Sequence, residues 1–129
     1  MILKALTRER VMFYGRVQGI GFRYRLKYAA SDRDLTGWVR NRYDGSVEAE
    51  IQGERDVITD LIKAMARIRF IRIDGIKRTE IPLEEGEHHF RIESYYVSQT
   101  DIFYTTNNAA IRELYRSYFF CRYILFIHL

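Results

Sequence analysis

A glycine-rich segment near the start of the chain has the residue types needed to hold an anion. It reads Gly15-Arg16-Val17-Gln18-Gly19-Ile20-Gly21-Phe22-Arg23 and lies between an alternating apolar segment, 11–14, and a helical pattern that begins near Phe22. Glycines permit positive φ, successive N–H groups in such a turn form a concave nest for anions, and the first helical turn adds unpaired N–H groups. Arg23 adds a guanidinium whose fork of donors matches phosphate oxygens. The segment therefore indicates an oxyanion site, with phosphate as the favoured anion.

Two common phosphate motifs do not fit this segment. A nucleotide P-loop would need a following Gly-Lys-Ser/Thr, and a dinucleotide fingerprint would need a third glycine after Gly19 and Gly21, where Phe22 and Arg23 stand instead. Taken alone, the segment is equally consistent with a tight turn whose glycines only reverse the chain and whose arginine is solvated.

A second segment decides between these interpretations. Gly37-Trp38-Val39-Arg40-Asn41 leads through Asp44-Gly45 into Val47, and Gly53 closes the segment. Together the two segments closely resemble the two signatures of the acylphosphatase family, Gly-Arg-Val-Gln-Gly-x-Gly-Phe-Arg and Gly-Trp-Val-Arg-Asn-x-x-x-Gly-x-Val-x-x-x-x-x-Gly. The resemblance covers about residues 8–94 and is specific, because two independent motifs occur in the right order.

The resemblance implies a metal-independent hydrolase that cleaves the carboxyl–phosphate bonds of small acyl phosphates to carboxylate and phosphate. It assigns catalytic roles to Arg23, which binds the phosphoryl group, and to Asn41, which orients the attacking water, while the substrate itself is thought to help accept the proton. We expect no cofactor and no metal ligand, and we expect inorganic phosphate or sulfate to be able to occupy the site. The expected phosphate-binding residues are Gly15, Arg16, Val17, Gln18, Gly19, Ile20, Gly21, Phe22 and Arg23.

The residue types in both motifs suit this reaction. The leaving group of an acyl phosphate is a carboxylate, which is stable near neutral pH without being protonated by the enzyme. The reaction therefore needs a phosphate clamp, an oriented water and charge stabilisation rather than a strong acid or a covalent nucleophile. A neutral amide at Asn41 suits the water, because a carboxylate there would repel the phosphate. The competing interpretations are an Arg23 that serves only surface charge and an Asn41 that serves only a turn.

Bulk composition sets the class of protein. The 129 residues are 47% apolar and 29% charged, with a net charge of +4, which is typical of one globular domain with or without an appendage. The basic excess is spread out, so it favours anionic ligands but gives little support for nucleic acid as a partner. Cys121 is the single cysteine, and Met1–Arg10 carries too many charges for a secretory signal. We therefore expect a cytoplasmic protein.

Hydrophobic periodicity predicts the elements that carry the motifs. In the third expected strand, Val47, Ala49 and Ile51 should face the core and Glu48 should face outward, together with Ser46, Glu50 and Gln52. Asp34 should end the first helix, and Asp44-Gly45 should turn a hairpin. The expected strands are 7–14, 36–42, 46–52, 70–77 and 88–93, and the expected helices are 22–33 and 54–68.

This order, βαββαβ with one further strand, predicts an α+β, ferredoxin-like sandwich with both helices on one face of an antiparallel-rich sheet. In that topology the first and second strands are parallel, with the third between them. Their carboxyl ends then lie at the same sheet edge, roughly 10 Å apart. We therefore expect the glycine loop with Arg23 to meet Asn41 in one site.

Other polar residues receive a structural interpretation. His88 and His89 would be neighbours on a strand and face opposite sides, so they could not bind one metal. The cluster of Arg67, Arg69 and Arg72 is typical of a solvated face, and it replaces a Gly-Pro that many acylphosphatases carry there. Gln18, with Arg16, is expected to shape the loop or steer anions.

The resemblance leaves residues 95–129 unassigned, so we predict a domain over 1–94 and an extension over 95–129. Asn107 or Asn108 could cap a helix from Ala109 onward. The apolar run 118–129 is too short to span a membrane, which needs about 20 residues. We expect it to pack against the open sheet face or to be disordered, with membrane or partner binding and self-association as alternatives.

Two further functions remain open for the domain. One is a non-catalytic, anion-sensing acylphosphatase-like domain, as occurs within hydrogenase maturation factors. The other is a nucleic-acid binder that uses the open sheet face, although no base-stacking aromatic signature is present in the sequence.

Overall fold

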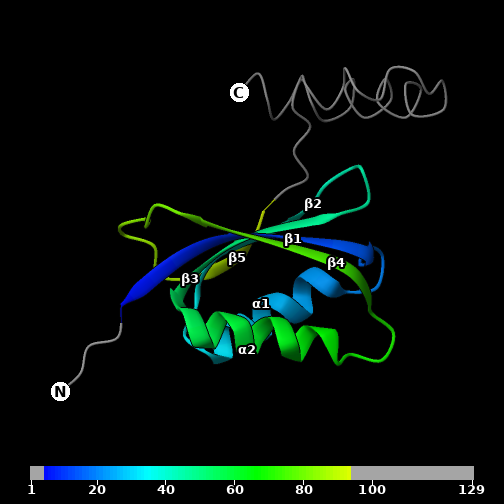
Figure 1. Cartoon of the computed structure of the whole chain (residues 1–129), viewed down its shortest axis with the longest axis horizontal. Helices are drawn as coiled ribbons and strands as arrows, with labels where there is room; N and C mark the ends of the chain where they lie inside the picture. The colour runs from blue at the N-terminus through cyan, green and yellow to red at the C-terminus, as the bar shows by residue number, and fades with distance from the viewer. Residues whose placement is uncertain (1–4, 94–129) are drawn as a thin grey trace. The chain divides into compact units, whose positions relative to one another are not determined.

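The computed structural model describes residues 5–93, which form an α+β fold. In chain order the elements are β1 (Leu6–Arg16), α1 (Phe22–Asp32), β2 (Thr36–Asn41), β3 (Val47–Glu54), α2 (Arg55–Ala66), β4 (Arg72–Ile81) and β5 (Phe90–Ile92). This βαββαβ order with one further strand confirms the predicted ferredoxin-like arrangement. Figure 1 shows both helices on the same face of the sheet, as predicted.

The sheet has the strand order β4-β1-β3-β2-β5. β1 and β2 each run antiparallel to β3, which lies between them, so β1 and β2 are parallel to one another. Their carboxyl ends therefore lie at the same edge of the sheet, which confirms the predicted topology.

The core lies between the sheet and the two helices. Alternate residues of the strands face the helices, because the side chains of a strand alternate between its faces. Helix residues at a spacing of three or four cover them from the other side. The buried residues include Val11, Phe13, Phe22, Leu26, Ala30, Val39, Val47, Ala49, Ile51, Ile58, Leu61 and Met65.

β1 is longer than predicted, because it continues through Gly15 and Arg16. The register between β1 and β4 shifts between Tyr14 and Gly15, which marks a β-bulge. Gly15 has φ 126°, and a Cβ there would lie 2.3 Å from the carbonyl oxygen of Arg72. Only glycine fits this close approach of two strands, so the first glycine of the motif sets where the loop leaves the sheet.

The end of the described chain also differs from the prediction. β5 begins at Phe90, so placing His88 and His89 on a strand was wrong. The preceding segment is held as a loop, because Gln52 both accepts a hydrogen bond from the Glu84 amide at 2.8 Å and donates one to the Glu84 carbonyl at 3.1 Å. Similarly, α2 ends at Ala66 and β4 begins only at Arg72, with turn hydrogen bonds from Ile68 to Met65 and from Ile71 to Ile68 between them.

The expectation that Glu48 faces solvent needs correction. Glu48 lies on the sheet face away from the helices, as alternation predicts, but its side chain is only 3% exposed. Long arginine side chains from β1, β2 and the hairpin cover it.

The predictions that concern residues 95–129, among them the domain division at 94, the helix from Ala109 and the apolar run 118–129, fall outside the described residues. They stay predictions. Neither of the helices in residues 5–93 is long and apolar enough to cross a membrane.

Candidate functional site

The loop between β1 and α1 is shaped by glycines and anchored by apolar side chains. Gly19 and Gly21 have φ of 77° and 78°, and Gly21 caps α1 without any side-chain hydrogen bond. Val17 is fully buried, and Ile20 packs against the core. With these two side chains anchored and the backbone turned at positive φ by the glycines, the short loop can present successive N–H groups to one side.

The N–H groups of this loop have no hydrogen-bond acceptor in the described part of the chain. Within residues 5–93, none of the backbone N–H groups from Val17 to Phe22 donates a hydrogen bond. The first turn of α1 contains no acidic residue that could neutralise the positive end of its dipole. The loop and the helix start therefore offer a set of donors with no protein acceptor among the described residues, which is what an anion site requires.

Arg23 occupies the second position of α1 and is half-buried. Its guanidinium makes no hydrogen bond or ion pair with any residue that the structure describes. An arginine with this freedom can turn its fork of donors to an anion held at the helix start.

Asn41 is the last residue of β2, and its Oδ1 is buried without a hydrogen-bond partner. In the described part of the chain it is the one buried side-chain nitrogen or oxygen in this condition. An unsatisfied buried acceptor costs about 1–3 kcal/mol, so such atoms are usually satisfied by a water or a ligand. The amide is therefore suited to accept a hydrogen bond from a bound water.

The sheet register fixes the separation between the two motifs. Phe13 of β1 and Asn41 of β2 are both opposite Val47 of β3, on its two sides. Asn41 thus lies two strand spacings, roughly 10 Å, from the strand that carries the glycine loop.

Gln18 connects the loop to the hairpin that follows Asn41. Its Nε2 donates hydrogen bonds to the carbonyl oxygens of Arg42 and of Ser46, the latter at 2.8 Å. The hairpin is itself fixed, since the Arg42 amide donates to Ser46 at 2.9 Å and the Gly45 amide donates to Arg42 at 3.2 Å. The predicted turn at Asp44-Gly45 is confirmed, and Gln18 holds the loop against it.

The structure therefore brings the glycine loop and the Asn41 end of β2 together, with Gln18 as the link between them. The motif included Gln18, but its partners could not be found from the sequence, because they are main-chain carbonyls of a distant turn. Arg16, at the end of β1, is exposed. The convergence of the Arg23 and Asn41 side chains on one ligand stays a prediction.

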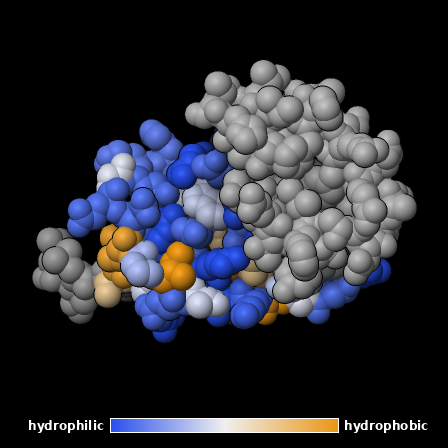
Figure 2. Space-filling view, turned by 90° about the horizontal axis from the view of Figure 1, so that it is seen from above, coloured by the Kyte–Doolittle hydropathy of each residue, from blue (hydrophilic) through white to orange (hydrophobic). Residues whose placement is uncertain are grey.

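The open face of the sheet, away from the helices, carries a different kind of charge cluster. Figure 2, seen from that side, shows mostly hydrophilic residues among those that it colours. Glu48 pairs with Arg10 at 2.6 Å, with Arg40 at 2.7 Å and with Arg42 at 3.2 Å. Burial alone would raise the pKa of the Glu48 carboxyl, but the hydrogen bond from Arg40 and the surrounding positive charges outweigh burial and lower this pKa below its usual value.

A second charge cluster, centred on a buried arginine, lies on the same face. The guanidinium of Arg8, which is 2% exposed, contacts Glu87 at 2.8 Å and Glu50 at 3.0 Å. Burial would raise the pKa of Glu87, whereas the hydrogen bonds from Arg8 and Thr36 outweigh it and lower this pKa. These pairs join the strands and the loop before β5, and they explain how charged residues can be buried there.

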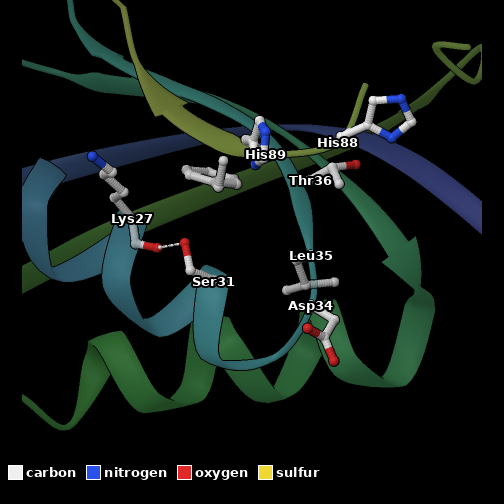
Figure 3. A pocket seen from close by; sticks show the side chains of 8 residues that line it. Lys27, Ser31, Asp34, Leu35, Thr36, His88 and His89 are labelled. Atoms are coloured by element: carbon white, nitrogen blue, oxygen red, sulfur yellow. Dashed lines mark hydrogen bonds between the residues drawn. The ribbon is translucent and has the colours of Figure 1, made fainter. Parts of the chain in front are cut away.

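A cavity of about 560 Å³ lies at the other end of β2, where the strand begins. Lys27, Thr36, His88 and His89 are among its lining residues, and Figure 3 shows the imidazole rings of His88 and His89 lying apart from each other. Asn41 and the glycine loop do not contribute to it. In residues 5–93 no group of three or more His, Cys, Asp or Glu side chains is arranged to hold a metal ion.

Comparison with known proteins finds similarity over the part of the chain that contains this loop and β2. The family model described as Acylphosphatase matches residues 9–92. The chain is 39% identical over 88 residues to a curated acylphosphatase of Bacillus subtilis, which covers 67% of this chain and 97% of that protein.

Solved structures show the same likeness. The crystal structure of acylphosphatase from Bacillus subtilis superposes with a TM-score of 0.63 at 38% identity, covering 69% of this chain and 99% of that one. An acylphosphatase from Coxiella burnetii gives 0.63 at 32% identity, covering 68% and 93%. Full-length HypF in a phosphate- and nucleotide-bound form gives 0.65 at 26% identity, covering 73% of this chain but only 13% of that one.

Proposed function

This chain belongs to the acylphosphatase family, and we propose that it hydrolyses the carboxyl–phosphate bond of small acyl phosphates at the glycine loop, with Arg23 and Asn41 as its catalytic residues and without a metal. The observation that supports this most is that hydrogen-bond donors for a phosphoryl group lie near a buried acceptor for a water. Among residues 5–93, the N–H donors of the loop have no acceptor and the buried Oδ1 of Asn41 has no partner, while Gln18 ties the loop to the turn that follows Asn41.

The phosphoryl group binds first. Its oxygens accept hydrogen bonds from the N–H groups of residues 17–22, and the guanidinium of Arg23 pairs with two of them. Because the N–H groups of the loop belong to the main chain and are in place before the substrate arrives, they stabilise the charge that gathers on the phosphoryl oxygens in the transition state with little reorganisation.

The attacking water is held by Asn41. Its Oδ1 accepts a hydrogen bond from the water, which leaves a lone pair of the water oxygen directed at phosphorus. The new bond forms from that oxygen to phosphorus, and the bond from phosphorus to the carboxyl oxygen breaks with its electron pair. A neutral amide cannot take the proton of the water, so the proton passes to an oxygen of the phosphoryl group.

The leaving group needs no acid. A carboxylate is stable at neutral pH, since the pKa of a carboxylic acid is about 4. Positioning and charge stabilisation can therefore account for the catalysis, and no carboxylic acid or imidazole of the chain is assigned a role.

The test is hydrolysis of benzoyl phosphate by the purified chain in the presence of EDTA. We expect turnover that EDTA does not reduce and that inorganic phosphate inhibits competitively. Loss of turnover on chelation would reject the metal-independent mechanism.

A second candidate is an anion-sensing domain without turnover, and the similarity to a small part of full-length HypF is the observation that favours it. Binding of inorganic phosphate, measured by calorimetry, together with no hydrolysis of benzoyl phosphate would support this candidate over the enzyme.

A further inference from the structure

Within residues 5–93, arginines near the glycine loop have few partners, whereas the arginines of the open sheet face are paired with carboxylates. Among the described residues, the side chains of Arg16, Arg25, Arg67 and Arg69 make no hydrogen bond or ion pair. A fifth, Arg72, is 72% exposed, and its one ion pair with a described residue is to Asp74 at 3.1 Å. We call these five residues the arginine rim.

The fold places the rim beside the loop. Arg16, the last residue of β1, is directly opposite Arg72, the first residue of β4. The segment 67–72 therefore reaches the sheet next to the point where the glycine loop leaves it.

A second contact ties the same segment to the start of α1. The guanidinium of Arg25 stacks on the ring of Phe70, 4.6 Å from its centroid. Arg25 lies two positions after Arg23 in the first turns of α1. The rim thus borders the loop on its β4 side, and Asn41 lies on the side of β3 and β2.

We propose that the arginine rim is a second anion subsite, and that the preferred substrates are acyl phosphates whose acyl part carries a further carboxylate or phosphate. This inference rests on the proposed function. The loop amides surround the phosphoryl group, so the acyl part must extend outward from the loop. An additional negative charge on it would then lie near arginines that have no carboxylate partner in the described chain except for Asp74.

The expected size of the effect follows from Coulomb's law. One unit charge roughly 10 Å from another in water changes an equilibrium by about twofold. Five arginines with one opposing carboxylate should therefore favour a substrate with the extra charge by about tenfold at low salt. In about 1 M salt the screening length falls to about 3 Å, so the preference should vanish.

The test compares two substrates that differ only in charge, 4-carboxybenzoyl phosphate and its neutral 4-carbamoyl isostere. We expect kcat/KM to be about tenfold higher for the carboxylate at low salt, with the ratio falling to near one in concentrated salt. The triple variant Arg67→Gln, Arg69→Gln, Arg72→Gln leaves only Arg16 and Arg25 beside Asp74, so the ratio should fall to about two, and Arg69→Glu should also lower it below the wild-type ratio. The control Arg55→Gln, an exposed arginine at the start of α2 paired with Glu80, should keep the wild-type ratio.

A wild-type ratio near one, or an unchanged ratio in the triple variant, would overturn the subsite. The failure of the proposed function gives a different result, since neither substrate would then be hydrolysed. In that event the subsite can still be tested by calorimetry with two non-hydrolysable analogues, 4-carboxybenzyl phosphonate and 4-carbamoylbenzyl phosphonate. The subsite predicts tighter binding of the carboxylate analogue, and equal affinities would reject it. A preference for long polyanions such as RNA over both phosphonates would also reject it in favour of a nucleic-acid surface.

Discussion

Two arginine-rich regions of this protein differ in what their guanidinium groups contact. On the open sheet face, Glu48 is surrounded by Arg10, Arg40 and Arg42, and it is almost fully buried. Around the glycine loop, Arg23 and the arginine rim have almost no carboxylate partners within residues 5–93. The first region satisfies its charges internally, whereas the second keeps its positive charge available.

The difference separates structural from functional charge. A buried carboxylate is tolerated only when its partners are in place, and removing one member of such a cluster leaves an uncompensated charge. Exposed arginines without partners cost the fold little and gain their energy only when an anion binds. The comparison therefore predicts that substitutions on the sheet face change stability and that substitutions at the loop change activity.

The largest expected effect is on catalysis, at the loop. Arg23→Ala and Asn41→Ala should each lower kcat/KM for benzoyl phosphate by about 10²–10³, because each removes a group that stabilises or orients the transition state. The thermal unfolding midpoint should stay within a few degrees of the wild-type value, which circular dichroism can measure.

The matched control is Lys27→Ala, one turn further along α1, which should keep wild-type activity. Arg23→Lys should recover only part of the lost activity, since it restores the charge but not the planar fork of donors. Full activity in either alanine variant would remove that residue from the proposed mechanism.

The sequence predicted the loop, the topology and the hairpin, because each depends on local signals. Glycines at positive φ, strand alternation and an Asp-Gly turn are all visible within a few residues. The burial of Glu48 could not be predicted. Alternation gives the face on which a side chain lies but not whether neighbours on other strands cover it.

The contacts of Gln18 and the start of β5 could not be predicted either, because both depend on contacts between distant parts of the chain. Gln18 bonds to the main chain of Arg42 and Ser46, which any residue could supply, so no pattern identifies them. The loop before β5 is held at Glu84 by the side chain of Gln52, which is a long-range contact that no local pattern indicates.

The next effect is on stability, at the sheet face. Glu48→Gln keeps the shape of the side chain but removes the charge that three arginines share, so we expect a loss of about 2 kcal/mol in the free energy of unfolding. That estimate lies below the range for fully buried pairs because the arginines are partly exposed. Urea denaturation measures the loss, and kcat/KM of the folded variant should equal the wild-type value. If Glu48→Gln instead kept wild-type stability but lost activity, the sheet face would serve catalysis, and the proposed distinction between the two regions would be wrong.

A smaller effect is expected where the loop meets the hairpin, at Gln18. Gln18→Ala removes the link between the loop and the turn after Asn41, so the water and the phosphoryl group would be less well aligned. We expect kcat to fall about tenfold with a smaller change in KM, since misalignment affects the transition state more than binding. A structural role alone would lower the unfolding midpoint and leave kcat of the folded protein unchanged. Gln18→Glu is the sharper variant, because its carboxylate would face two carbonyl oxygens and a bound phosphate.

The smallest expected effect is the acid dependence of the sheet-face pairs. The pKa of Glu48 is lower in the folded protein than its ordinary value of 4.5, so the folded state binds fewer protons than the unfolded state. The stability that this ionisation provides is therefore fully present above the ordinary pKa and is lost as the pH falls through the lower, folded pKa. Glu87 shifts in the same direction and adds to the loss. The difference in unfolding free energy between wild type and Glu48→Gln should accordingly be largest near pH 7 and should shrink steadily as the pH falls below 4.5, measured by urea denaturation across that range. A difference that stays constant down to acid pH would mean that the charge of Glu48 contributes nothing to the fold, and the contrast between paired and unpaired arginines would then rest on packing alone.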